Sequence, residues 1–195
     1  MTLRALTMLL ILLTAACSSA PTRYFTLISA PSGVVATLGS APVQFALQPV
    51  RIPVQVDQPA HVIRQSDDRL AVLETAQWAS PLADELHDAL AADLERNLGA
   101  RDLSGLPRDR HEPFVSILID VRRFESQPGR QTELDALWSL QLVRNGTTHR
   151  LMCSSTFQER AGADLQSIVL AHQRAIGRLA KAVAPVVLRL NAEGS

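Results

Sequence analysis

A change of hydrophobic period near residue 80 is the feature that most restricts how this chain folds. From Leu82 to Leu98 a leucine recurs at every fourth position, which is the spacing of one face of an α-helix. Ser80 is suited to the N-cap, Pro81 to the first helical position and Gly99 to the C-terminal cap. The sequence therefore predicts a helix about 27 Å long, and we expect its leucine face to pack on a sheet.

On both sides of this helix, apolar residues follow the patterns of β-strands. The predicted strands are Tyr24–Ile28, Val43–Ile52, His61–Gln65, Arg69–Glu74, Phe114–Phe124, Thr132–Val143 and Thr148–Arg160. Ser66-Asp67-Asp68 predicts the turn of one hairpin, and Asn145-Gly146, which tolerate positive φ, the turn of a second. Pro49 and Pro53 place the second strand at a sheet edge, because proline donates no backbone hydrogen bond. Phe45, Leu47, Pro49 and Arg51 share one side of that strand.

A second apolar stripe predicts a long C-terminal helix that begins near Asp164, and we expect Pro185 to kink or end it. The stripe contains Leu165, Ile168, Val169, His172, Ile176, Leu179 and Val183, with His172 interpreted as a histidine at the edge of the core. Residues 29–42 and 101–112 are predicted loops. This order of elements predicts an α/β fold, or α+β, with a mixed and largely antiparallel sheet packed against two long helices.

Composition excludes several classes of protein. The chain has 195 residues, with Lys+Arg 19 and Asp+Glu 19, so it lacks the basic surplus of a nucleic-acid binder. A hydrophobic content of 47% with 19% charged residues is typical of a folded chain. We predict one domain over residues 23–195, a size at which neither a metal nor a disulfide is needed for stability.

The first residues predict a secretion signal over residues 1–16. Arg4 precedes an uncharged, leucine-rich stretch that is too short for the roughly 20 residues of a membrane-spanning helix. The stretch ends in Leu13-Thr14-Ala15-Ala16-Cys17, which resembles the bacterial lipobox. Cys17 would then carry diacylglycerol and an N-acyl chain as the first mature residue. The alternative is ordinary signal cleavage after Ala16, with Cys17 an incidental thiol.

Residues 17–22 form a short tether in this interpretation, and the acyl chains suffice for stable membrane anchoring. Ser18 resembles the residue that follows the cysteine in lipoproteins exported to the outer membrane, where the domain would face the periplasm. Because the lipid occupies Cys17, Cys153 has no intrachain partner and no disulfide is predicted.

Catalytic and metal-binding patterns are weak. Cys153 and His149 lie about 13 Å apart along one predicted strand, so a hydrolase would need Cys153 or a serine within about 3 Å of another histidine. The histidines show no metal-binding spacing, and there is no glycine-rich phosphate loop.

We interpret Asp84, Glu85, His87 and Asp88 as a solvated first-turn face. The basic pairs Arg108/Arg110 and Arg122/Arg123 lie among acidic residues on a mixed surface that could contact lipid headgroups or a partner. The sequence predicts no enzyme, no metal and no cofactor.

Three regions together resemble the ABC-type transport auxiliary lipoprotein family, which includes paraquat-inducible protein C. They are Thr22–Leu27, then Val50–Pro53 leading into Val62–Asp67, and finally Trp78–Leu82. The motif residues, for which we expect structural roles, are Tyr24, Arg51, Pro53, Arg64, Ser66, Asp67, Trp78, Ser80, Pro81 and Leu82. The resemblance implies a fold similar to the amino-terminal domain of the Tol system's propeller protein.

The resemblance also implies a function. Members of this family would serve as outer-membrane lipoprotein subunits of an intermembrane lipid-transport system, together with an inner-membrane permease, an ATPase and a periplasmic protein with MCE domains. This chain would dock the transport conduit at the outer membrane, as a homo-oligomer. The alternative is a structural envelope lipoprotein that binds peptidoglycan or Tol-type partners without handling lipid, because one fold serves both roles.

Overall fold

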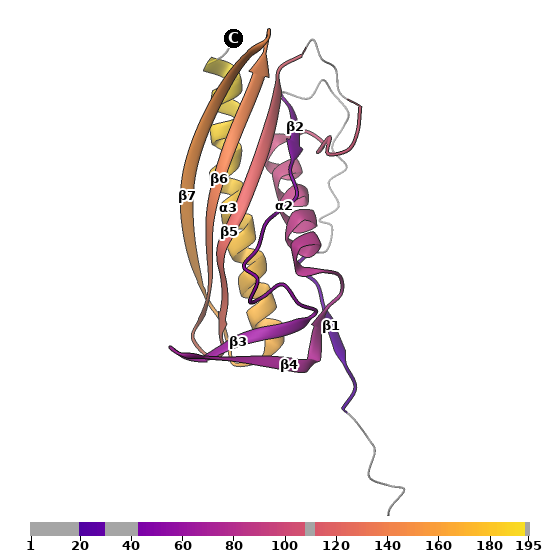
Figure 1. Cartoon of the computed structure of the whole chain (residues 1–195), viewed down its shortest axis with the longest axis vertical. Coiled ribbons are helices and arrows are strands. Elements are labelled where there is room, and N and C mark those ends of the chain that lie inside the picture. The colour runs from indigo at the N-terminus through magenta and orange to yellow at the C-terminus, as the bar shows by residue number, and fades with distance from the viewer. Residues whose placement is uncertain (1–19, 30–42, 108–111, 194–195) are drawn as a thin grey trace, which may run out of the picture.

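The computed structural model describes residues 20–29, 43–107 and 112–193. Its strands are β1 (Arg23–Phe25), β2 (Gln44–Leu47), β3 (Ala60–Ser66), β4 (Arg69–Trp78), β5 (Phe114–Gln127), β6 (Gln131–Arg144) and β7 (Thr147–Arg160), and its helices are α2 (Leu82–Leu98) and α3 (Leu165–Glu193). The described part is elongated, with the long strands and α3 running along its length (Figure 1).

The strands form two sheets. The larger has the order β2-β5-β6-β7, in which β2 pairs parallel with β5 and the other pairs are antiparallel. The smaller has the order β1-β4-β3, with β1 parallel to β4. The hairpin of β3 and β4 crosses one end of the molecule beside β1, whereas α3 ends at the opposite end (Figure 1). The molecule therefore has a β1 end and an α3 C-terminal end.

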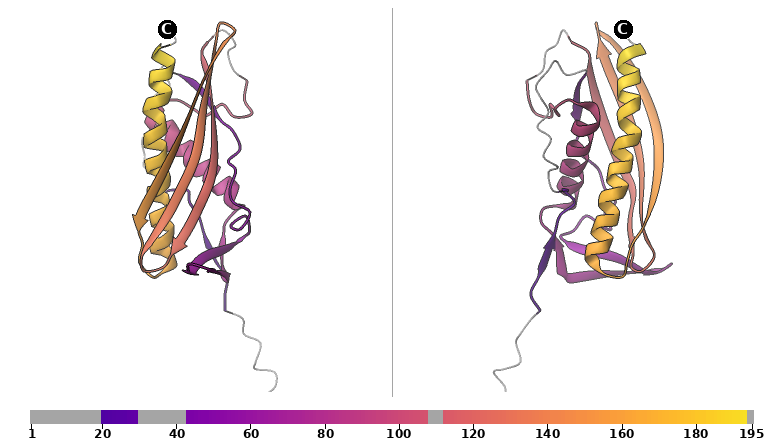
Figure 2. Two further views of the ribbon diagram at one scale, coloured as in Figure 1. Left: turned by 60° about the vertical axis from the view of Figure 1, so that its left-hand side comes forward. Right: turned by 180° about the vertical axis from the view of Figure 1, so that it is seen from behind.

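Both helices cover one face of the larger sheet and lie side by side there (Figure 2). The whole leucine stripe of α2 is buried, as the spacing predicts, at Leu82, Leu86, Leu90, Leu94 and Leu98. It shares one core with the inward residues of the larger sheet, among them Ile117, Ile119 and Leu140. Neither described helix covers the other face of this sheet, and the residues of β5 and β6 alternate between buried and accessible.

The predicted turns and fold class are confirmed. The first hairpin turns at Asp67-Asp68, and the second at Asn145-Gly146, with φ of 50° and 76°. Gly99 ends α2 in the left-handed conformation, with φ of 62°, and its N–H donates to the carbonyl of Glu95. A mixed sheet packs against two long helices, although a second, smaller sheet was not predicted.

Several predicted boundaries are wrong. Strand β1 ends at Phe25 and β2 at Leu47, rather than at residues 28 and 52. Beyond Leu47 the chain keeps only single backbone contacts with β5, such as Arg51 N–H to the carbonyl of Ile119, since two prolines interrupt the ladder. β2 is nevertheless the edge strand that the prolines predict.

The two helix ends also differ from the predictions. Pro81, not Ser80, is the N-cap residue of α2, and no side chain caps this end. The hydroxyl of Ser80 instead donates to the buried carboxylate of Glu85. Helix α3 does not end at Pro185 but continues to Glu193, because Pro185 is exposed and solvent can bond the carbonyl that lacks its donor.

Candidate functional site

A stack of aromatic rings and histidines fills the junction of the two sheets and α3. Phe25 of β1 contacts His61 of β3 edge-on, with ring centroids 5.1 Å apart. His61 stacks on Trp78 of β4 at 3.8 Å, and Trp78 lies 6.2 Å from Phe124 of β5. Phe124 stacks on His172 of α3 at 3.9 Å. The stack thus connects β1, at the N-terminal side of the fold, to the C-terminal helix.

Both histidines of the stack are neutral at pH 7. Burial lowers the pKa of His61 from 6.5 to about 4. Burial, with the nearby His61 as a smaller cause, lowers the pKa of His172 to about 3. The structure confirms that His172 belongs to the core, where its exposed fraction is 0%.

The structure does bring a serine to a histidine, which the sequence did not predict. Ser126 Oγ lies 2.9 Å from His172 Nε2. Within the described residues, Nδ1 of His172 has no hydrogen-bond partner, so no carboxylate orients the ring as in a catalytic triad. An imidazole with a pKa near 3 is also a poor general base at neutral pH. We therefore interpret this pair as part of the core.

Glu85 joins the start of the domain to helix α2. Its carboxylate is 2% exposed and accepts hydrogen bonds from Thr26 Oγ1 at 2.7 Å, the backbone N–H of Leu27 at 2.8 Å and Ser80 Oγ at 2.9 Å. The prediction that Glu85 lies on a solvated face is therefore wrong, because its partners reach it from the segment after β1 and from the turn before α2. Asp84 and Asp88 are exposed, as predicted.

Arg64 joins the smaller sheet to the larger one. Its Nε and Nη2 donate to the two carboxylate oxygens of Glu125 at 2.8 and 2.7 Å, and Nη1 donates to the carbonyl of Asp67 at 2.9 Å. This pairing holds the pKa of Glu125 below its usual range. Bidentate arginine–carboxylate pairs fix orientation, so Arg64 sets the angle of the β3–β4 hairpin against β5.

The other motif residues serve the same end of the fold or its surface. Arg51 lies 3.4 Å from Asp120, and the carbonyl of Pro53 accepts a hydrogen bond from the N–H of Val56. The hydroxyl of Ser66 donates to the carboxylate of Asp68, and the carbonyl of Pro81 accepts from N–H groups in the first turn of α2. Leu82 is buried, whereas Tyr24 is 67% exposed. Trp78, Ser80 and Arg64 therefore converge on the junction, whereas Tyr24 lies on the surface. The family resemblance pointed to Ser80 and Arg64, but it did not point to the carboxylates that accept their hydrogen bonds, Glu85 and Glu125.

The remaining candidates stay apart. Cys153 is half-buried against the core and has no disulfide partner among the described residues, and His149 is exposed four positions away on the same strand. In the described ranges, no group of three or more His, Cys, Asp or Glu side chains is placed to hold a metal ion. Of the helices that the structure describes, none is long and apolar enough to cross a membrane. Cys17, Arg108, Arg110 and residues 30–42 lie outside the described residues.

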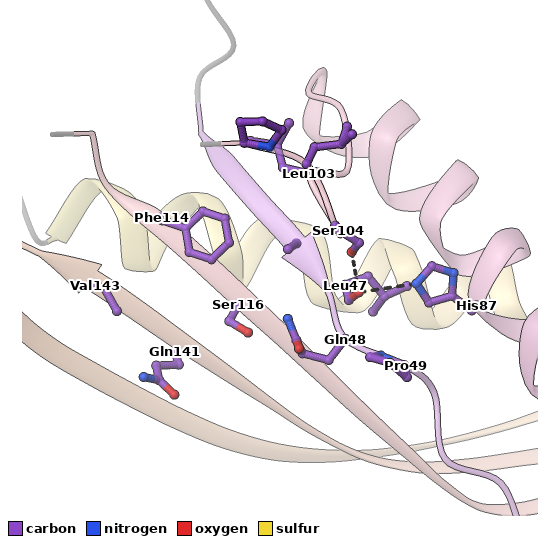
Figure 3. Close-up of a pocket in the computed structure, with 14 residues that line it drawn as sticks. Leu47, Gln48, Pro49, His87, Leu103, Ser104, Phe114, Ser116, Gln141 and Val143 are labelled. Atoms are coloured by element: carbon purple, nitrogen blue, oxygen red, sulfur yellow. Dashed lines mark hydrogen bonds between the residues drawn. The ribbon is translucent and has the colours of Figure 1, made fainter. Parts of the chain in front are cut away.

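An open groove lies beside β2, the start of β5 and the end of β6 (Figure 3). The start of β5 and the end of β6 lie at the opposite end of the molecule from β1 (Figure 1). It has a volume of about 800 Å³. Its lining, within the described residues, is apolar and polar, contains no Asp, Glu, Lys or Arg, and includes Pro49, His87, Leu103, Leu106, Phe114 and Gln141. Ser104 Oγ donates to the carbonyl of Leu47 at 2.5 Å, and this hydrogen bond holds the loop that follows α2 against β2 (Figure 3). Leu106 is 59% exposed. We call this feature the distal groove.

Comparison with known proteins decides the family. The model of the family described as "ABC-type transport auxiliary lipoprotein component" matches residues 25–184. This chain belongs to that family. The match spans both sheets and most of α3, and so includes the junction built by Glu85, Arg64 and the aromatic stack. As a family of lipoproteins, it comprises membrane-anchored proteins of auxiliary function in transport.

Solved structures share the fold. A crystal structure of an uncharacterized protein is similar with a TM-score of 0.63 and 14% identity, over 86% of this chain and 99% of that one. Protein XCC0632 from Xanthomonas campestris is similar with a TM-score of 0.59 and 20% identity, over 90% of this chain and 96% of that one. No curated protein matches this chain significantly. These similarities support the fold alone.

Proposed function

We propose that this chain is the outer-membrane accessory subunit of an intermembrane lipid-transport system. Cys17 carries diacylglycerol and an N-acyl chain, and the domain faces the periplasm. Its partners are a periplasmic protein with MCE domains, an inner-membrane permease and an ATPase. The observation that carries the proposal is the family match over residues 25–184, preceded by the lipobox-like sequence that ends at Cys17.

The shape of the molecule supports a docking role. The anchor would enter the fold at β1, whereas the distal groove lies at the other end (Figure 1). Strands β5 and β6 have 14 residues each, which is a length of about 45 Å. The domain would thus hold the groove well away from the bilayer, where a periplasmic conduit can reach it. The ATPase supplies the energy, and this chain supplies position and a binding surface.

The proposal includes assembly as a homo-oligomer. β7 is the edge strand of the larger sheet and, within the described part of the chain, no strand pairs with its outer side. Such a long edge offers backbone donors and acceptors to a neighbouring copy. Light scattering of the purified lipoprotein in detergent tests this: a mass that is a multiple of the chain is expected, and a single-chain mass at all concentrations contradicts assembly.

The docking role is tested by purification from mildly crosslinked cells. Tagged full-length protein should recover the MCE-domain protein and its permease, and the Cys17→Ala form should lose both. A Leu106→Asp variant should lose the same partners while it remains anchored, because it places a charge in the distal groove. Leu170→Asp is the matched control, since Leu170 is 46% exposed on α3, outside both the distal groove and the β7 edge.

Two outcomes would contradict the proposal. Recovery of only peptidoglycan-linked or Tol-type proteins would overturn the transport role and favour an envelope scaffold. Equal recovery of the MCE-domain protein with Leu106→Asp would move the docking surface away from the distal groove.

A further inference from the structure

Arginine and aliphatic side chains meet in a second, smaller groove at the β1 end of the molecule. It has a volume of about 260 Å³ and lies between the β3–β4 hairpin, the segment before β3 and β5. Its lining combines the aliphatic residues Val56, Val62 and Leu70 with Arg64, Arg122 and Arg123 and with the carboxylate of Glu125. Arg64, Phe124 and Glu125 belong to the junction described above, whereas the exposed Leu70 and Arg122 have no role in it.

A β-bulge presents two consecutive arginines to solvent. Val121 lies opposite Ala136 and Arg123 opposite Asp135, so Arg122 is an extra residue with no partner on β6. The side chains of Arg122 and Arg123 are 61% and 52% exposed. Bulges re-aim side chains, and both arginines of this one are among the residues that line the groove.

The three arginines differ in how many of their guanidinium N–H donors are already hydrogen-bonded to neighbouring residues. Arg64 is fully engaged by Glu125 and two backbone carbonyls. Arg123 donates to Glu133 at 2.8 Å and lies 3.8 Å from Glu125. Arg122 has one longer contact, of 3.7 Å, with Asp120. Since a guanidinium has five N–H donors, Arg122 retains most of its donors for a ligand.

Aliphatic side chains in and beside this groove are exposed. Val54 is 87% exposed, Val72 43% and Leu70 42%. Val54 lies in the segment that lines the groove, and Val72 is two residues from Leu70, opposite Val62 in the sheet register. Single exposed apolar residues are common, but three around one groove indicate a surface that is covered by something. We call Val54, Leu70, Val72, Arg122 and Arg123 the hairpin patch.

The position of the patch indicates what covers it. The hairpin crosses the end of the molecule where β1 begins (Figure 1). Six peptide units separate Cys17 from Arg23, so the tether reaches at most about 20 Å. A lipid anchor at Cys17 would therefore keep this end near the bilayer surface. Guanidinium groups bind phosphate, and aliphatic side chains enter the interfacial region beside it.

We propose that the hairpin patch binds the anionic phospholipid surface of the membrane in which the chain is anchored. Arg122, assisted by Arg123, bonds lipid phosphates, and Val54, Leu70 and Val72 lie among the interfacial groups. The contact fixes the tilt of the domain, so that the distal groove points away from the bilayer. This inference rests on the lipid anchor of the proposed function.

The test uses the full lipidated protein reconstituted in phosphatidylethanolamine vesicles with phosphatidylglycerol. An environment-sensitive fluorophore is attached at Val72→Cys in a Cys153→Ser background, and a matched one at Met152→Cys. We expect brominated lipids to quench the label at residue 72 and not the label at residue 152. The double change Arg122→Gln and Arg123→Gln should reduce that quenching at least about twofold, whereas Arg150→Gln, an exposed arginine of β7, should not.

Flotation of the vesicles separates this inference from the proposed function. Protein that floats without quenching at residue 72 would overturn the hairpin patch and leave the anchor intact. Quenching that is equal in zwitterionic phosphatidylcholine vesicles and insensitive to the arginine changes would overturn the role of the arginines in binding anionic lipid. Protein that does not float would contradict the anchor and the inference together. A melting temperature for each variant checks that its fold is retained.

Discussion

At the scale of single residues, the carboxylate of Glu85 is the group on which the N-terminal strand most depends. Its three donors lie on β1's continuation and on the turn before α2. Glu85→Gln removes the charge and one acceptor oxygen, so we predict a loss of about 1–3 kcal/mol in the free energy of unfolding. Urea titration of the purified lipoprotein measures this loss.

The matched control for Glu85 is its neighbour Asp84, an exposed carboxylate of the same helical turn. Asp84→Asn should cost less than about 1 kcal/mol, which is the scale of an exposed interaction with the helix dipole. Equal losses in the free energy of unfolding for the two variants would show that the buried hydrogen bonds of Glu85 stabilise the fold no more than an exposed carboxylate does.

The buried histidines predict how stability depends on pH. Their pKa values are lowered in the folded state, to about 4 for His61 and about 3 for His172, whereas the unfolded chain binds these protons near pH 6.5. Stability should therefore be full above about pH 6.5 and fall as the pH drops towards 4, by up to about 1.4 kcal/mol per pH unit for each histidine. His61→Phe keeps the stack and should halve this slope.

Unfolding titrations between pH 7.5 and 4.5 measure the slope. Below about pH 5.5 the unfolded chain begins to bind protons at carboxylates whose folded pKa is lowered, such as Glu125 and Glu159, so the slopes of the two proteins are compared above that pH. A slope that is the same with and without His61 would mean that this ring does not titrate on unfolding.

At the scale of secondary structure, helix α3 contains an internal proline, Pro185, whose side chain is not buried against the core. Pro185 is exposed and the helix continues on both sides of it. An interior proline costs a helix about 3 kcal/mol, part of which is recovered when solvent bonds the freed carbonyl. Pro185→Ala should raise the free energy of unfolding by about 1–3 kcal/mol. An unchanged or lower value would indicate that the proline contributes a contact of its own.

The elements that could be predicted from sequence are those with local signals. The leucine period, Gly99 and Asn145-Gly146 each act within a few residues, so helix α2 and the β6–β7 hairpin are where they were predicted. The parallel pairs of β1 with β4 and β2 with β5 join segments far apart in the chain, and no local pattern encodes them.

The same distinction holds for the candidate site. Trp78, Ser80 and Arg64 were located by resemblance, but the first-turn acid Glu85 has the same local pattern as a solvated residue, and its burial depends on Thr26, 59 positions away. Glu125 and the Ser126–His172 contact were missed for the same reason, since their partners are 61 and 46 positions away.

At the scale of the whole molecule, the fold separates two surfaces. The β1 end carries the junction and the hairpin patch, and the opposite end carries the distal groove (Figure 1). An accessory subunit that links a membrane to a conduit needs such a separation. The proposed function therefore requires that the distal groove contacts the conduit while Cys17 holds the other end at the membrane.

Site-specific photocrosslinking in living cells tests this claim most directly. A photoreactive amino acid replaces Leu106 in the distal groove and, as a control, Met152 on β7. The proposed function predicts a covalent adduct with an MCE-domain protein from residue 106 and not from residue 152. The adduct should be lost when Cys17→Ala removes the anchor. Adducts with peptidoglycan-linked or Tol-type proteins, or equal adducts from both positions, would contradict it.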